Sequence, residues 1–135
     1  YHNCGGALDL PAALAEAWRR GGRVPGGVCG NWGVCGAAAG AGIFASVVAG
    51  SNPLNAAVWH LPQQLAAKCL EGIATCGGPR CCKRTSRTAV ETAAAFAKAH
   101  FGVDMPCARG PCGYFEKNRE CILDRCPYYG IEQER

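Results

Sequence analysis

The chain has 135 residues, which suits a single domain, with a formal net charge of +4 and only 18% charged residues. Its 49% hydrophobic content excludes a disordered charged tail, and the small net charge is well below that of a dedicated nucleic-acid binder. The apolar runs are short and rich in Gly and Ala, so we expect no membrane span. Eleven cysteines stand out, and they indicate a small domain whose function depends on its thiols.

Large apolar side chains are scarce and Ala is the commonest residue, so the sequence predicts close helix packing without a deep core. Such a domain needs additional cross-links, and the cysteines can provide them as metal ligands or as disulfides. The chain begins at Tyr1 rather than Met, as expected of a processed chain or of a piece of a longer one.

The first predicted helix covers residues 10–20, with Asp9 as its N-cap and two glycines at its end. Residues 25–36 are dominated by Gly and contain Cys29 and Cys35, which predicts a loop folded closely around a bound group. A side chain at Gly36 is expected to obstruct that closure. Residues 37–49 then predict a helix lined with small residues.

A third helix is predicted to begin at Asn52 and Pro53, a cap followed by Pro at the first helical position. Apolar residues recur at helical spacing up to residue 73, and Gly77 ends the pattern. Pro62 interrupts this pattern, so we expect it to kink the helix or to split it in two.

Ser86 is predicted to cap the last long helix, which ends at Gly102. Beyond Pro106 the chain is irregular and is expected to fold back over the rest. Because no strand alternation occurs, the predicted fold class is mainly α. We expect one domain over residues 1–135, a small helical bundle whose Cys/Gly/Pro-rich loops converge on a metal centre.

The cysteine spacing favours iron–sulfur ligation. Clusters are bound by thiolates that come from loops with small neighbours, and a Cys-Pro pair commonly ends such a loop. Neighbouring cations offset the charge of the cluster. The candidate ligands are Cys29, Cys35, Cys81, Cys82, Cys121 and Cys126, and Cys112 is a further candidate metal ligand. The expected cofactor is a [4Fe-4S] cluster, or more than one, because eleven thiols exceed four ligands.

Two alternatives remain open at this level. Zinc could be held by Cys107, Cys112, Cys121 and Cys126, although their spacings are long for zinc knuckles, and the chain would then be a zinc-clipped, non-enzymatic interaction module. A secreted, disulfide-stapled domain is the second alternative. The odd number of cysteines and the adjacent pair Cys81-Cys82 argue against full pairing.

Other residues receive simpler interpretations. Cys69 lies on the apolar stripe of its helix and is predicted to be a core residue. Arg80, Lys83 and Arg84 belong to a positive run that is either a solvated helix entry or a site for an anionic ligand. The sequence assigns no catalytic residue, so an enzymatic activity is neither predicted nor excluded.

Three stretches, residues 24–44, 77–84 and 118–128, carry a family resemblance, most specifically Gly-Gly-Pro-Arg-Cys-Cys-Lys-Arg at 77–84. From about Leu10 onward the chain resembles an uncharacterised cysteine-rich domain family of anaerobic bacteria and methanogenic archaea, whose members occur alone or fused behind radical S-adenosylmethionine domains. The resemblance implies anaerobic redox or sulfur chemistry, and the same six thiols, from Cys29 to Cys126, as the site. The implied partner is a redox protein or a radical S-adenosylmethionine enzyme.

A weaker analogy exists to the Cys-Cys-Gly domains of heterodisulfide reductases, where a single Cys, a Cys pair and a later Cys pair hold a non-cubane cluster. Here Lys83 replaces the Gly that follows the pair, and the last spacing is longer.

From these observations together we expect a cytoplasmic iron–sulfur protein that binds a small thiol or anion, with neither nucleic acid nor membrane as a partner.

Overall fold

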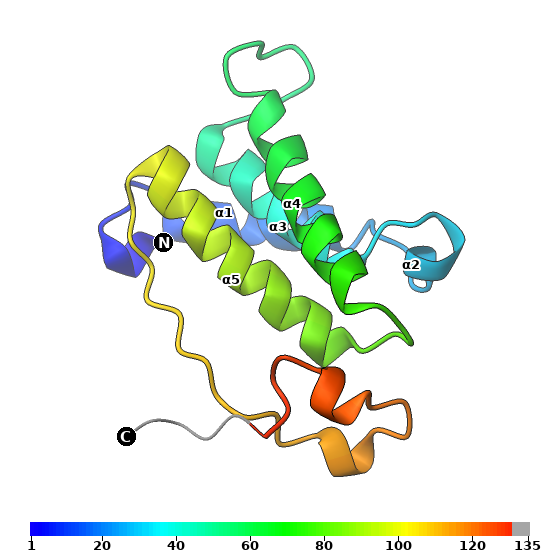
Figure 1. Ribbon diagram of the computed structural model, residues 1–135. Coiled ribbons are helices and arrows are strands. Elements are labelled where there is room, and N and C mark those ends of the chain that lie inside the picture. Colours follow the sequence, from blue (N-terminus) through cyan, green and yellow to red (C-terminus); the bar gives the residue numbers. More distant parts are fainter. Residues whose placement is uncertain (131–135) are drawn as a thin grey trace.

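The computed structural model describes residues 1–130 (Figure 1). These residues form a small all-helical domain without a strand in that range, which confirms the predicted mainly α class. The α-helices are α1 (Leu10–Gly21), α2 (Val28–Asn31), α3 (Gly36–Ala49), α4 (His60–Cys76) and α5 (Cys82–Phe101). Short 3-10 helices cover His2–Cys4, Phe115–Lys117 and Leu123–Arg125. Among the described residues, none of the helices combines the length and the apolar composition of a membrane span.

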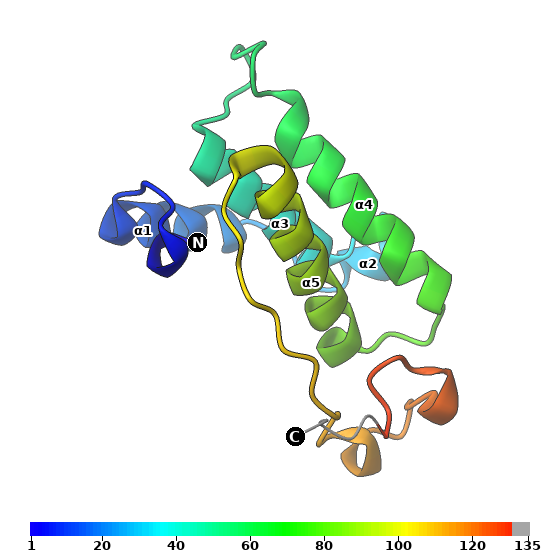
Figure 2. The same cartoon turned by 60° about the vertical axis from the view of Figure 1, so that its left-hand side comes forward.

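The core lies between α3, α4 and α5, which pack against one another (Figures 1 and 2). Its buried side chains are mostly small: Ala38, Ala41, Ala45, Leu65, Cys69, Ala89 and Phe96. Small side chains let the helices approach closely, and a Cβ at Gly42 would lie only 3.2 Å from the carbonyl oxygen of Pro62. The domain therefore relies on close backbone approach, as the Ala-rich composition predicts.

Helix α1 begins where the sequence predicts. The Oδ1 of Asp9 accepts a hydrogen bond from the Ala12 amide at 3.1 Å, which is the geometry of an N-cap. The Nη1 of Arg20 donates to Ser46 Oγ at 2.7 Å and ties α1 to α3. Because Trp18 is 85% exposed, α1 lies on the surface of the bundle rather than in its core.

The predicted start of the third long helix is wrong. Residues 52–59 form turns, in which Asn52 Oδ1 accepts a hydrogen bond from the Leu54 amide at 2.9 Å. This local bond gives the backbone an alternative to the helix. Helix α4 begins at His60, so Pro62 lies in the first helical turn, where its missing N–H is not needed. The expected split at Pro62 does not occur.

Helix α5 also begins elsewhere than predicted, one turn earlier. Cys81 is its N-cap residue, and the Thr85 amide donates to the Cys81 carbonyl oxygen at 3.0 Å. Ser86, the predicted cap, lies inside the helix and is exposed. Gly102 ends α5 in the left-handed conformation, as predicted. The early start puts Cys81 and Cys82 at the N-terminal end of a 20-residue helix.

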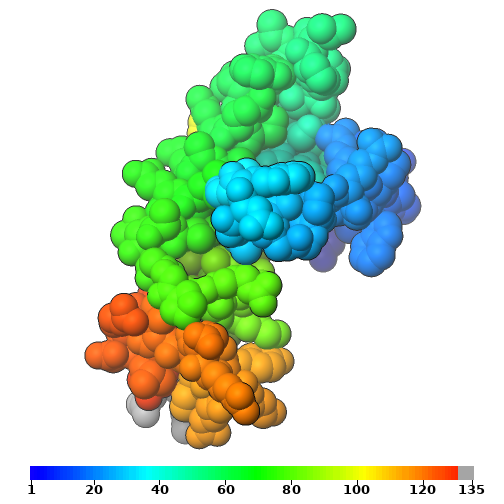
Figure 3. Space-filling view, turned by 90° about the vertical axis from the view of Figure 1, so that its right-hand side faces the viewer, coloured from blue at the N-terminus to red at the C-terminus, as the bar shows by residue number. Residues whose placement is uncertain are grey.

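After α5 the chain returns along the helix to its N-terminal end, where residues 111–130 form an irregular C-terminal lobe (Figures 1 and 3). The guanidinium of Arg87 donates to the carbonyl oxygens of Gly110 and Pro111. Tyr128 is 3% exposed, and its hydroxyl lies 3.3 Å from Thr88 Oγ1 on α5. These contacts fix the C-terminal lobe to α5, and the expected fold-back is observed.

Candidate metal centre

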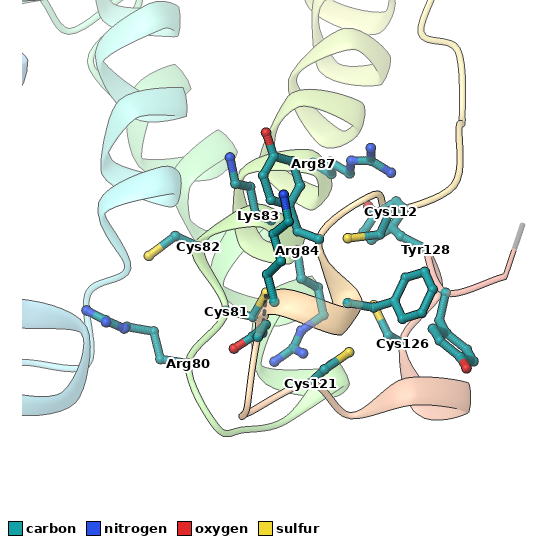
Figure 4. A pocket seen from close by; sticks show the side chains of 15 residues that line it. Arg80, Cys81, Cys82, Lys83, Arg84, Arg87, Cys112, Cys121, Cys126 and Tyr128 are labelled. Atoms are coloured by element: carbon teal, nitrogen blue, oxygen red, sulfur yellow. Dashed lines mark hydrogen bonds between the residues drawn. The ribbon is translucent and has the colours of Figure 1, made fainter.

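A cavity of about 280 Å³, called here the C-terminal cavity, lies between the start of α5 and the C-terminal lobe (Figure 4). Five cysteines line it: Cys81, Cys82, Cys112, Cys121 and Cys126. All of them are half-buried except Cys82, which is exposed. In Figure 4 the Cys82 sulfur points away from the other four, toward the side on which Arg80 lies. Four thiols from two distant segments of the sequence therefore share one space.

The C-terminal cavity is strongly positive. Among residues 1–130 its lining includes five cations and no carboxylate; the cations are Arg80, Lys83, Arg84, Arg87 and Lys117. The N-terminal end of α5 adds the positive end of a helix dipole. Thiolates, sulfide and other anions are therefore the groups that this cavity favours.

Arg84 differs from the other cations because it is only 4% exposed. Its Nη2 donates to the carbonyl oxygens of Gly77 at 2.8 Å and Pro79 at 2.9 Å, and these bonds hold the segment that precedes Cys81. Its Nε is buried and has no hydrogen-bond partner among residues 1–130. An unpartnered buried donor costs about 1–3 kcal/mol, so this position of Arg84 is held at the expense of stability.

Lys83 and Arg80 were predicted as anion-binding residues together with Arg84. The Nζ of Lys83 lies 4.0 Å from the centre of the Tyr114 ring, at the rim of the cavity. Arg80 is exposed and forms no salt bridge among residues 1–130. Arg84 lines the cavity as well, and its Nη2 holds the backbone before Cys81.

Asn118 connects the C-terminal lobe to the cysteine pair. Its Nδ2 donates to Cys81 Sγ at 3.8 Å, and its Oδ1 accepts from the Glu120 amide at 3.2 Å. The Cys112 amide donates to the Tyr128 carbonyl oxygen at 2.9 Å. Burial raises the pKa of the Tyr128 phenol, so this side chain stays protonated at neutral pH. The cavity wall is thus held by a hydrogen-bonded frame.

The six predicted cofactor ligands do not all meet in the C-terminal cavity. Cys29 and Cys35 line a second one, called here the N-terminal cavity, of about 440 Å³. Cys82 is its third thiol, and both Cys82 and Arg80 line the two cavities. A Cβ at Gly36 would meet no atom within 4 Å, so the expected obstruction at this position is not found.

The remaining cysteines lie outside both cavities. Cys69 is fully buried in the core, as predicted, and burial raises the pKa of its thiol. Cys107 is exposed and lines a separate depression beside Arg109, so the predicted zinc quartet is not assembled. All eleven cysteines lie within residues 1–130 and are free thiols, so no disulfide joins the helices there.

The thiols of the C-terminal cavity do not form a ready-made single-ion site. Within residues 1–130, no group of three or more Cys, His, Asp or Glu side chains is placed to hold a metal ion. A zinc ion needs its thiolates at about 2.3 Å, all around one point. The four half-buried thiols instead line one space of about 280 Å³.

Sequence reasoning missed Asn118, Lys117 and Tyr128 as parts of this site. No local pattern marks Lys117 or Tyr128, since both reach the cavity only through the folding of the C-terminal lobe. Asn118 is three residues before Cys121, and the Cys121 amide donates to its carbonyl oxygen at 3.0 Å. Its position in the Asn-x-x-Cys segment was the one available signal.

Comparison with known proteins gives one match. A protein-family model described as "Family of unknown function (DUF5714)" matches residues 1–129. No curated protein and no solved structure gives a significant match.

Proposed function

The chain belongs to DUF5714, a family of unknown function, so we propose its function from its own residues. We propose an iron–sulfur protein of anaerobic redox or sulfur chemistry, with a [4Fe-4S] cluster in the C-terminal cavity. Its ligands would be Cys81, Cys112, Cys121 and Cys126. The observation that carries the proposal is this set of four half-buried free thiols lining one positive cavity.

The surroundings of these thiols support the proposal. A cluster with four thiolates is anionic, and the part of the lining that the structure describes offers five cations without a carboxylate. Arg84 lines the same cavity and is only 4% exposed, so its positive charge is little screened by water. The Asn118 donor to Cys81 Sγ is the kind of hydrogen bond that sets the reduction potential of a cluster.

The chemistry of such a group is electron transfer, or binding of sulfur and small thiols where an iron lacks a protein ligand. The chain's own residues would orient an anionic partner at the rim of the cavity. Arg80 and Lys83 are both exposed there, so a small thiol or another anion could reach them from solvent.

Free thiols in this number suit a reducing compartment, and we place the protein in the cytoplasm on that ground. The resemblance to domains fused behind radical S-adenosylmethionine domains suggests a partner. We propose a redox protein or a radical S-adenosylmethionine enzyme in that role.

Anaerobic purification followed by iron and acid-labile sulfide analysis tests the proposal. Both elements should copurify with the chain, together with the visible sulfur-to-iron charge-transfer absorption. The variant Cys121→Ser should lower bound iron, because it removes a ligand of the C-terminal cavity. The matched control is Cys107→Ser, which changes an exposed thiol outside that cavity and should leave bound iron unchanged.

Three results would contradict the proposal. Zinc without sulfide would favour the zinc-clipped interaction module, and intact disulfides in the purified chain would favour a secreted, stapled domain. Equal iron in Cys121→Ser and the wild type would exclude the C-terminal cavity as the binding site.

A further inference from the structure

The adjacent cysteines at the start of α5, Cys81 and Cys82, have different surroundings. Cys81 lies in the C-terminal cavity, where Asn118 donates to its sulfur. Cys82 lines both cavities, and Figure 4 shows its sulfur directed away from those of Cys112, Cys121 and Cys126. The start of the helix thus separates two neighbouring thiols between two spaces.

The N-terminal cavity is formed by three parts of the chain. Helix α2 provides Cys29, the start of α3 provides its N-cap Cys35 and its first turns, and α5 provides Cys82. Cys29 and Cys35 are half-buried, while Cys82 is exposed. Three thiols from separate segments therefore line a cavity that is larger than the C-terminal one, about 440 Å³.

The charges in the N-terminal cavity favour an anionic occupant. Of the described residues, 1–130, Arg80 is the only charged one in its lining, and none of the lining residues is Asp, Glu or His. Two helices of 14 and 20 residues, α3 and α5, begin at this cavity, and neither N-cap residue, Cys35 or Cys81, makes a side-chain capping hydrogen bond. Both helix dipoles therefore direct positive ends toward the same three thiols.

We propose that the N-terminal cavity is a second iron–sulfur site, with Cys29, Cys35 and Cys82 as its protein ligands. The inference rests on the proposed function, because it assigns the same chemistry to a second set of thiols. Three protein thiolates leave one iron of a [4Fe-4S] cluster without a protein ligand. That position would take a small external thiolate, and Arg80, which lines the same cavity, would attract the anion.

The two sites have different roles in this assignment. The C-terminal site has four protein thiols and suits electron transfer, whereas the N-terminal site is open and suits ligand binding. Cys81 and Cys82 are consecutive residues, so the two clusters would be joined through their two side chains and the single peptide unit between them. Arg80, which lines both cavities, lies between them.

The test uses the full chain, purified and reconstituted anaerobically with iron and sulfide. Two clusters per chain correspond to about eight iron atoms. The double variant Cys29→Ser/Cys35→Ser should keep roughly half of the iron and sulfide, and Cys121→Ser/Cys126→Ser should keep the other half. The matched control Cys4→Ser/Cys107→Ser changes two exposed thiols that line neither cavity and should bind the full amount.

The variants distinguish the inference from the proposed function. Full iron in Cys29→Ser/Cys35→Ser, with complete loss in Cys121→Ser/Cys126→Ser, overturns the second site and leaves the first. Complete loss of iron in Cys29→Ser/Cys35→Ser, with full iron in Cys121→Ser/Cys126→Ser, overturns the C-terminal assignment. It leaves the N-terminal cavity as the binding site. Unchanged iron in both double variants overturns both assignments.

A spectroscopic readout keeps the inference testable if a double variant loses its helical circular dichroism. In the reduced wild-type chain, electron paramagnetic resonance should show two distinct cluster signals. Addition of 2-mercaptoethanol should shift only one of them, because only the N-terminal cluster has an open iron. The inference is overturned if each chain binds a single cluster. It is also overturned if 2-mercaptoethanol shifts neither of the two signals.

Discussion

A pair of glycines in α3 provides a quantitative test of how this Ala-rich domain packs. In the variant Gly42→Ala, the added Cβ would lie 3.2 Å from the Pro62 carbonyl oxygen and 3.4 Å from the Ala66 Cβ. The nearer contact is backbone of α4, which cannot move aside without shifting the helix. Gly40 lies on the same helix, and a Cβ there would meet no atom within 4 Å.

Two opposing terms decide the free energy of unfolding. Replacing a helical Gly by Ala stabilises by about 1 kcal/mol through the backbone. Overpacking costs about 1–3 kcal/mol, and this cost applies only at Gly42. Gly40→Ala should therefore stabilise the domain by about 0.5–1 kcal/mol. Gly42→Ala should destabilise it by about 1 kcal/mol.

Urea denaturation followed by circular dichroism measures both changes, with wild type and variants prepared in the same metal state. A difference of about 2 kcal/mol between the variants should appear, with melting temperatures separated by roughly 6–10 °C. Equal stability of Gly42→Ala and Gly40→Ala would refute the close approach of α3 and α4.

Two further predictions concern local bonds. The carboxylate of Glu16 accepts hydrogen bonds from Arg19 and Arg20, which lower its pKa to about 2 from 4.5. The stabilisation from this lowered pKa is present above pH 4.5 and is lost as the pH falls through about 2, so a carboxyl NMR titration of Glu16 with a midpoint near 4.5 would contradict the contact. Tyr128→Phe removes the 3.3 Å contact with Thr88 at a cost of about 1 kcal/mol, and it should speed hydrogen exchange in the C-terminal lobe; unchanged exchange there would show that the hydroxyl does not hold the lobe.

The helical class and several helix ends follow from local sequence signals. Asp9 and Gly102 act through bonds to residues a few positions away or through their own backbone conformation, so their roles can be read locally. The same holds for Cys69, whose place on an apolar stripe predicted its burial. The start of α5 could not be read in this way, because Arg84 holds the segment before it through bonds to Gly77 and Pro79.

The division of the thiols was decided by the tertiary structure alone. Sequence spacing grouped Cys81 with Cys82 and Cys107 with Cys112. In the fold, Cys82 also lines the N-terminal cavity, and Cys107 lies outside the cavity that Cys112 lines. Which sulfur faces which cavity depends on the direction of the first turn of α5 and on the return of the C-terminal lobe along that helix. Both depend on packing between segments that are distant in the chain, and the local sequence does not predict that packing.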